Sequence, residues 1–213
     1  LAACGNNNSG GTPAGASAAA PTGDKVIVIG GSGPLTGDAS SYGISVQQGA
    51  EVAIEELNAA GGVDGYTFKY IIKDDKAAAA DASTAYDLLY DEGMVISTGS
   101  VTSGSGVAFG QKAAQDGLFF ITPSASSADV IATGDTAFRV CFGDPDQGVL
   151  AADLLTDGYK KIGCIYDTSD TYSQGIYTAF EARMKELGKE YEVRTFDADN
   201  KKDFSAQFHR SKA

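Results

Sequence analysis

Two stretches of this chain decide its fold: Thr98-Gly99-Ser100-Val101-Thr102-Ser103-Gly104 and Thr122-Pro123-Ser124-Ala125-Ser126-Ser127. Each follows a short apolar segment that is typical of a buried strand, and each opens a helix. In an open parallel sheet, ligands bind outside the carboxyl ends of the strands, where free N–H groups and helix dipoles favour an anion. Two such segments on neighbouring strands therefore predict a pocket for a carboxylate or phosphate, with the hydroxyls of Ser103 and Ser126 as hydrogen-bonding groups. For either segment alone, N-capping of the following helix is the alternative.

Strand-like and helix-like segments alternate from Lys25 onward. The run from Val26 to Ile29 is β-branched, as expected for a parallel strand that is buried on both faces. A helix is expected from Ser45 to Ala60, because its apolar residues recur with a period of 3.6 and two glycines stop it. The alternation continues over residues 68–72, 81–91, 94–97 and 118–121. It predicts an α/β fold with a mostly parallel sheet.

A polar turn from Gly143 to Gly148 then leads into a helix near residues 149–155, and we interpret it as the crossing into a second lobe. Strands are expected at residues 161–166 and 191–196, and helices at 174–187 and from about residue 203. Only about 70 residues follow the crossing, which is few for a domain. We therefore divide the chain into residues 1–24, 25–141 and 142–213, and we expect a fragment whose second lobe is incomplete.

The first 24 residues suggest a membrane anchor. Leu1-Ala2-Ala3-Cys4 resembles a bacterial lipobox, in which the cysteine becomes the lipidated N-terminus after a signal peptide is removed. Residues 6–23 consist almost wholly of small and polar residues, which cannot form a core and are typical of a flexible linker. We expect lipid on Cys4 to tether an extracytoplasmic protein to the cell membrane of a bacterium. A random cysteine in a disordered tail is the alternative.

Composition narrows the class of partner. With 28 acidic and 16 basic residues the formal charge is -12, so a nucleic acid would be repelled. No apolar run approaches the roughly 20 residues that span a bilayer, so we expect membrane contact only through Cys4. Cys141 and Cys164 lie in apolar strand contexts and are expected to be buried free thiols, although their spacing does not exclude a disulfide.

Catalytic templates do not fit the sequence. The single histidine, His209, stands in a polar segment near the end, so a Ser-His-Asp or Cys-His arrangement lacks a base, and Ser103 as a nucleophile lacks one too. We expect no enzyme activity.

Motifs for metals and cofactors fit no better. Gly30-Gly31-Ser32-Gly33-Pro34 follows a strand but lacks the third glycine of a dinucleotide loop. Asp74-Asp75 at a strand end is better explained as an exposed acidic turn than as a metal site. Asp197 to Lys201 begins like a calcium loop but has lysine where an oxygen ligand belongs, so it is expected to be a solvated turn. We expect no cofactor and no metal.

Several short motifs nevertheless occur together in one order. They are Gly33-Pro34-Leu35-Thr36-Gly37, Tyr42-Gly43, Gly49-Ala50, Asn58 to Val63, Asp74-Asp75, Gly99 to Ser105, Thr122 to Ser126, Asp146-Gln147-Gly148 and Tyr172-Ser173-Gln174-Gly175. This ordered set resembles the branched-chain amino acid binding proteins of ABC transporters, from about Lys25 to Phe204. The resemblance implies a type I periplasmic-binding fold: two doubly wound parallel-sheet lobes, joined by a hinge, which close over a ligand. On this resemblance, we expect the second lobe to be truncated in this chain.

The resemblance also implies roles for five residues. Ser103 matches the serine that binds the ligand α-carboxylate, and Ser126 stands where the family usually has a threonine that contacts carboxylate and ammonium. Ser124 matches a position whose backbone carbonyl accepts from the ammonium. Tyr42 and Tyr172 match aromatic residues that line the cleft from opposite lobes; half-exposed tyrosines packed on a strand edge are the alternative. The acidic residue that completes ammonium recognition is expected beyond Ala213.

These observations predict a binding function. The leading hypothesis is an extracytoplasmic solute receptor that captures an amino acid, branched or otherwise apolar, and delivers it to the permease subunits of an ABC importer. A sensory ligand-binding domain of the same fold is the alternative. The tether that ends at Cys4 favours transport, because a sensor needs a membrane helix or a downstream domain.

Overall fold

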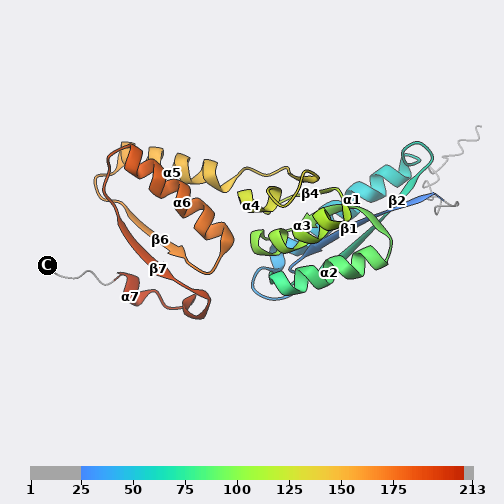
Figure 1. Ribbon diagram of the computed structural model, residues 1–213, viewed down its shortest axis with the longest axis horizontal. Coiled ribbons are helices and arrows are strands. Elements are labelled where there is room, and N and C mark those ends of the chain that lie inside the picture. The colour runs from blue at the N-terminus through green and yellow to red at the C-terminus, as the bar shows by residue number, and fades with distance from the viewer. Residues whose placement is uncertain (1–24, 209–213) are drawn as a thin grey trace, which may run out of the picture.

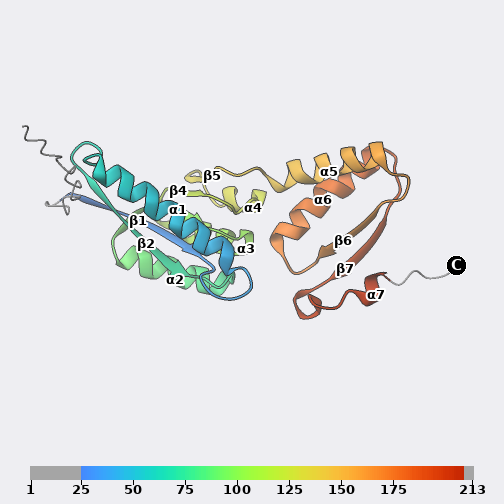
Figure 2. The ribbon, with the colours of Figure 1, turned by 180° about the vertical axis from the view of Figure 1, so that it is seen from behind.

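A computed structural model describes residues 25–208 of the chain. Figures 1 and 2 show two lobes along the long axis of the molecule, and Figure 2 shows the segment between β5 and α5 that connects them. We call the part with β1–β5 the first lobe and the part with β6 and β7 the second lobe. The sheets are parallel in both lobes, which confirms the predicted α/β class.

The first lobe contains a five-stranded sheet in the order β2-β1-β3-β4-β5. Its elements are β1 (Val26–Gly33), α1 (Ser40–Ala59), β2 (Thr67–Asp74), α2 (Ala79–Asp91), β3 (Met94–Ser100), α3 (Ser103–Asp116), β4 (Phe120–Thr122), α4 (Ala128–Ile131) and β5 (Ala137–Arg139). Helix α1 covers one face, and α2 and α3 cover the other, as the opposite views in Figures 1 and 2 show. The strand order reverses between β1 and β3, which is the point where doubly wound sheets bind ligands.

The second lobe begins with α5 (Asp144–Gly158), followed by β6 (Gly163–Asp167), α6 (Thr171–Glu186), β7 (Glu192–Phe196), the short 3-10 helix η1 (Ala198–Asn200) and α7 (Ser205–Phe208). Strands β6 and β7 form a two-stranded parallel sheet. Helices α5 and α6 pack against each other around Ala152, Phe180 and Met184. Within residues 25–208 the chain passes between the lobes once, at residues 140–143.

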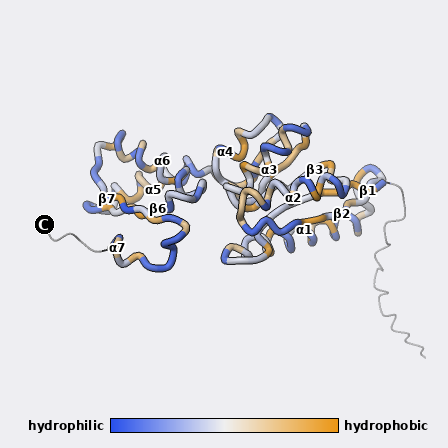
Figure 3. The backbone as a smooth tube through the Cα atoms, turned by 60° about the horizontal axis from the view of Figure 1, so that its bottom comes forward, coloured by the Kyte–Doolittle hydropathy of each residue, from blue (hydrophilic) through white to orange (hydrophobic). Residues whose placement is uncertain are grey.

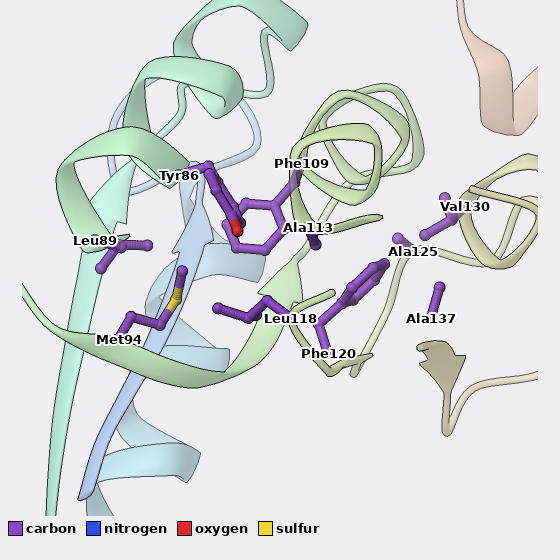
Figure 4. Close-up of a cluster of buried hydrophobic side chains, with 10 residues drawn as sticks. All are labelled: Tyr86, Leu89, Met94, Phe109, Ala113, Leu118, Phe120, Ala125, Val130 and Ala137. Atoms are coloured by element: carbon purple, nitrogen blue, oxygen red, sulfur yellow. The ribbon is translucent and has the colours of Figure 1, made fainter. Parts of the chain in front are cut away.

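The core of the first lobe lies between the sheet and helices α2 and α3. Figure 4 shows its aromatic centre, where the ring of Phe109 meets Tyr86 and Phe120 edge to face at centroid distances of 5.0 and 5.9 Å. The hydropathy colouring in Figure 3 places hydrophobic stretches along the strands of this lobe. Burial of such large side chains contributes about 1.5–3 kcal/mol each, which explains why these strands are the centre of the lobe.

The other face of the same sheet is only partly covered. Val95 in β3, Phe119 just before β4 and Phe138 in β5 lie next to core residues, and they are 63%, 37% and 48% exposed. The rings of Phe119 and Phe138 stack on each other at 5.3 Å on this face. The prediction of a first strand buried on both faces is therefore wrong for its apolar half: Val26 to Ile29 are exposed or half-buried, and the buried part of β1 is Gly30 to Gly33.

Three further expectations need correction. Helix α1 begins at Ser40, not at Ser45, so Tyr42 is helical. Helix α5 begins at Asp144, so the predicted polar turn is in fact its first turns, with Pro145 at the start. Cys141 and Cys164 are free, as predicted, but both are only half-buried.

None of the helices between residues 25 and 208 combines the length and the apolar character that crossing a membrane requires.

Candidate functional site

The N-terminal ends of α3 and α6 face each other across the space between the lobes. A Cβ atom placed on Gly104, the second residue of α3, would lie 3.8 Å from Oγ1 of Thr171, the first residue of α6. Both helices are long enough to have a dipole whose positive end lies at this point. The site is also next to the carboxyl ends of β1 and β3, where the strand order reverses. Figure 2 shows the two helix ends turned toward each other.

Ser103 is the first residue of α3 and is 4% exposed. Its Oγ accepts a hydrogen bond from the backbone N–H of Ser127 at 3.2 Å, so its own proton is free to donate to another group. The N-cap residue Thr102 makes no capping bond, and its Oγ1 is buried without a hydrogen-bond partner among residues 25–208. The capping alternative therefore does not describe α3. It does describe Ser127, whose Oγ accepts from the N–H of Asp129 at the start of α4.

The segment from Ser124 to Ser127 lies opposite Ser103, after β4. Ser126 is 3% exposed, and its backbone carbonyl accepts from Arg139 Nη1 at 2.7 Å and from the N–H of Asp144 at 3.1 Å. These two bonds fix Ser126 at the crossing between the lobes. Ser124 is half-buried. The ligand contacts that the sequence assigns to Ser103, Ser124 and Ser126 stay predictions, but the structure brings the three serines to one place through the Ser103–Ser127 bond.

Tyr42 and Tyr172 come from opposite lobes and both are exposed, at 64% and 42%. They lie in helices α1 and α6. Burial raises the pKa of Tyr172, and the charges of Asp144 and Tyr42 raise it further. The hydroxyl of Tyr172 is also 3.5 Å from Oε1 of Gln147.

Sequence reasoning did not identify Asp144 as part of the site. This first residue of α5 is fully buried, and its Oδ2 has no hydrogen-bond partner among the described residues. Burial raises the pKa of the Asp144 carboxyl, while the Ser126 hydroxyl and the charge of Arg139 counteract part of the rise. Gly175 in α6 leaves room for the Asp144 carboxylate, because a Cβ on residue 175 would lie 2.8 Å from Oδ2 of Asp144. The sequence did carry one signal for this helix start, because Asp144 directly precedes Pro145 and proline is common at the first positions of a helix.

The prediction for Asp74-Asp75 is half wrong. Asp74 is partly exposed and accepts from the N–H of Leu35 and the hydroxyl of Thr36, as a turn residue does. Asp75, in contrast, is fully buried. The Asp197 segment is a solvated turn as predicted, since Asp197 accepts from the N–H of Asp199 in η1. Across residues 25–208, His, Cys, Asp and Glu side chains do not gather into a group of three that could hold a metal ion.

Two predicted features lie outside the residues that the structure describes. They are the lipid anchor at Cys4 with its tether, and His209.

The sequence model of a family described as periplasmic binding protein matches residues 26–213. An "Amino acid binding protein" of Pseudomonas aeruginosa is 33% identical over 184 residues, which are 84% of this chain and 49% of that protein. Among solved structures, the branched-chain amino acid transporter substrate binding protein LivJ of Streptococcus pneumoniae, in complex with isoleucine, superposes with a TM-score of 0.77 at 30% identity, covering 86% of this chain and 53% of LivJ.

A solute binding protein of an ABC transporter from Rhodopseudomonas palustris, in complex with 3,4-dihydroxybenzoic acid, has a TM-score of 0.76 over 86% of this chain and 50% of that one. At 18% identity, this likeness concerns the fold alone. The chain spans about half the length of the curated relatives it matches.

Proposed function

Because this chain belongs to the periplasmic binding protein family, we propose that it captures an amino acid between its two lobes for uptake by an ABC importer. The matches to LivJ and to other type I periplasmic-binding structures agree with the predicted fold and with the resemblance to branched-chain amino acid binders. The proposal for the ligand itself is based on the residues of the cleft.

The ligand carboxylate is assigned to the N-terminus of α3. The first intrahelical bond reaches Thr102 O from the N–H of Gly106, so the N–H groups of residues 103–105 have no partner within the helix. The free proton of the Ser103 hydroxyl adds a side-chain donor to these N–H groups. A carboxylate placed here receives charge-assisted hydrogen bonds, which are about twice as strong as neutral ones.

The ligand ammonium is assigned to the neighbourhood of Ser126 and Asp144, in addition to the acidic residue that the resemblance places beyond Ala213. A buried carboxylate with an unpartnered oxygen is costly unless a cation or further donors reach it. An ammonium that bonds the Ser126 hydroxyl lies beside this carboxylate. The buried acid next to a donor-rich helix end is the single observation that carries the proposal, because together they match both charges of an amino acid.

The ligand side chain is assigned to the space between Tyr42 and Tyr172. Both rings are exposed and come from opposite lobes, on α1 and α6, so they offer apolar surface to a ligand that binds between the lobes. An aliphatic or aromatic side chain would gain about 25 cal/mol for each Å² of apolar surface that they cover. This fits a branched-chain or otherwise apolar amino acid.

An aromatic acid without an ammonium group is a second candidate, because a protein of this fold is known in complex with dihydroxybenzoate. Thermal-shift measurements on this chain with L-leucine, 4-methylpentanoate and 3,4-dihydroxybenzoate separate the two. 4-Methylpentanoate is leucine without its ammonium group. We expect leucine to raise the melting temperature, and 4-methylpentanoate to raise it less at equal concentration. A larger shift with either acid than with leucine would contradict the assignment of Asp144.

We further propose an extracytoplasmic location with lipid on Cys4, on the basis of the lipobox-like sequence and the linker-like composition of residues 6–23. The tether would hold the two lobes near the permease subunits of the importer. Capture would proceed by closure of the lobes about the crossing at residues 140–143. A ligand that contacts both lobes binds the closed state more tightly than the open state, and it therefore shifts the protein toward the closed state.

A further inference from the structure

Asp75 connects three segments of the first lobe through one buried carboxylate. It follows the last residue of β2 and has an exposed fraction of 0%. Its Oδ2 accepts from the hydroxyl of Ser32 in β1 at 3.0 Å and from the hydroxyl of Ser100 in β3 at 2.7 Å. Its Oδ1 accepts from the N–H of Ala77 at 3.0 Å. The ion pairs found among residues 25–208 do not include Asp75, so hydrogen bonds alone compensate its burial.

The network continues from Ser100 to the loop that holds Ser124 and Ser126. The carbonyl of Ser100 accepts from Oγ1 of Thr122 at 2.7 Å. The same Oγ1 accepts from the N–H of Ala125 at 3.0 Å and lies 3.4 Å from the N–H of Ser124. Ser100 and Thr122 are both fully buried. A continuous path therefore leads from Asp75 through the end of β3 to the loop after β4.

The same end of β3 also leads along the backbone to Ser103. Ser100 is the last residue of β3, and α3 begins three residues later. Asp75 therefore holds the residue at which β3 ends, and the chain continues from there into α3, whose N-terminus is assigned to the ligand carboxylate. The two hydroxyl-rich segments are joined again at the Ser127 N–H, which donates to Ser103 Oγ.

We propose that Asp75 is a positioning residue for the ligand site, which fixes the start of α3 relative to the Ser124–Ser127 loop. This inference rests on the proposed function in one respect, namely that the start of α3 and the Ser124–Ser127 loop bind the ligand. Bonds to an ionised acceptor are shorter and stronger than neutral ones, so a carboxylate holds two serine hydroxyls more firmly than a neutral side chain does. In a low-dielectric interior such a network acts as a unit. Because Asp75 is fully buried, it would act through these two segments and not by touching a ligand.

Amide hydrogen exchange on this chain tests the positioning directly. The reporters are the N–H groups of Ala125 and Ser127, which bond within the network, and the reference is the α2 helix. In Asp75→Ala we expect exchange at both reporters to accelerate by at least about tenfold relative to the reference amides. Asp75→Asn, which keeps the shape and one acceptor, should give an intermediate increase at the same amides.

Tyr86→Phe is the matched control. It removes another side-chain hydrogen bond of the first lobe, from the buried Tyr86 to the exposed Asp116 at 2.8 Å. Asp116 is the last residue of α3, about 20 Å along the helix from Ser103. This variant should lower the stability of the lobe and leave the relative exchange of Ala125 and Ser127 unchanged.

If Asp75→Ala does not fold, Ser100→Ala removes one arm of the same network and should accelerate the same two amides. Exchange that rises equally in α2 and at the reporters would overturn the positioning role, as would unchanged reporters. Titration of the wild-type chain with L-leucine keeps the two claims apart. A wild type that fails to bind contradicts the proposed function, whereas leucine affinity in Asp75→Ala equal to that of a binding wild type contradicts only the positioning role.

Discussion

Replacement of Ser103 by alanine should destabilise the first lobe even without a ligand. The Ser103 hydroxyl accepts from the N–H of Ser127, and both residues are buried, at 4% and 3% exposure. Alanine leaves that N–H without its acceptor and away from water. A buried orphan donor costs about 1–3 kcal/mol, which is a large share of a typical total stability of about 5–15 kcal/mol.

Ser105→Ala is the matched control, since Ser105 lies in the same first turn of α3 and is fully buried. Its Oγ has no hydrogen-bond partner among the described residues, so alanine removes a desolvated polar atom and breaks no bond there. We expect wild-type or slightly higher stability. Urea denaturation followed by circular dichroism measures both variants. Equal stability of Ser103→Ala and Ser105→Ala would refute the hydrogen bond on which our description of the site depends.

Three other predictions concern the second lobe and the anchor. In α5, Gly148→Ala should lower the free energy of unfolding by about 1–3 kcal/mol through overpacking, because its Cβ would lie 2.4 Å from the carbonyl of Ile176 in α6. The control Gly158→Ala has nothing within 4 Å of its Cβ and should raise the free energy of unfolding by up to about 1 kcal/mol. Similar denaturation midpoints for the two variants would contradict the close helix contact. Burial acts to raise the pKa of Asp167, but hydrogen bonds from Lys201 and Ser169 outweigh it and lower the pKa. Lys201→Met should therefore be less stable than Lys202→Met at pH 7, and this difference in stability should disappear as the pH falls through the lowered pKa of Asp167. A difference that persists at pH 2 would argue against this origin. Cys4→Ala should move the exported protein from the membrane fraction to the soluble fraction, and unchanged sedimentation with membranes would exclude the lipid anchor.

The order and type of most elements could be predicted from the sequence, because the helices show a period of 3.6 residues and the strands are short apolar runs; the short helix α4 was not predicted. Element starts were harder to predict, as the early start of α1 shows. Gly43 looks like a helix breaker, but it is needed inside the helix, where a Cβ would lie 2.1 Å from the carbonyl of Pro34. That close approach depends on the β1–α1 loop and leaves no periodic signal in the sequence.

The buried acids were missed for a related reason. Asp75 and Asp144 look like turn residues locally, since polar residues surround both. Their burial depends on partners that are distant in sequence: Ser32 is 43 residues from Asp75, and Ser126 and Gly175 approach Asp144 from either side of it in the chain. The serines of the site were easier to predict, because strand ends followed by hydroxyl-rich helix starts are a local pattern with a general role in parallel sheets.

The central claim is that an amino acid binds between the N-terminus of α3 and the Ser124–Ser127 loop. Titration of isotope-labelled chain with L-leucine, followed by amide chemical shifts, tests it most directly and detects even weak binding. We predict saturable shifts that are largest at residues 103–105 and 126–127. Saturable shifts centred instead on the second-lobe cavity of about 400 Å³ that residues 163–166 help to line, or no saturable shift at all, would contradict the account.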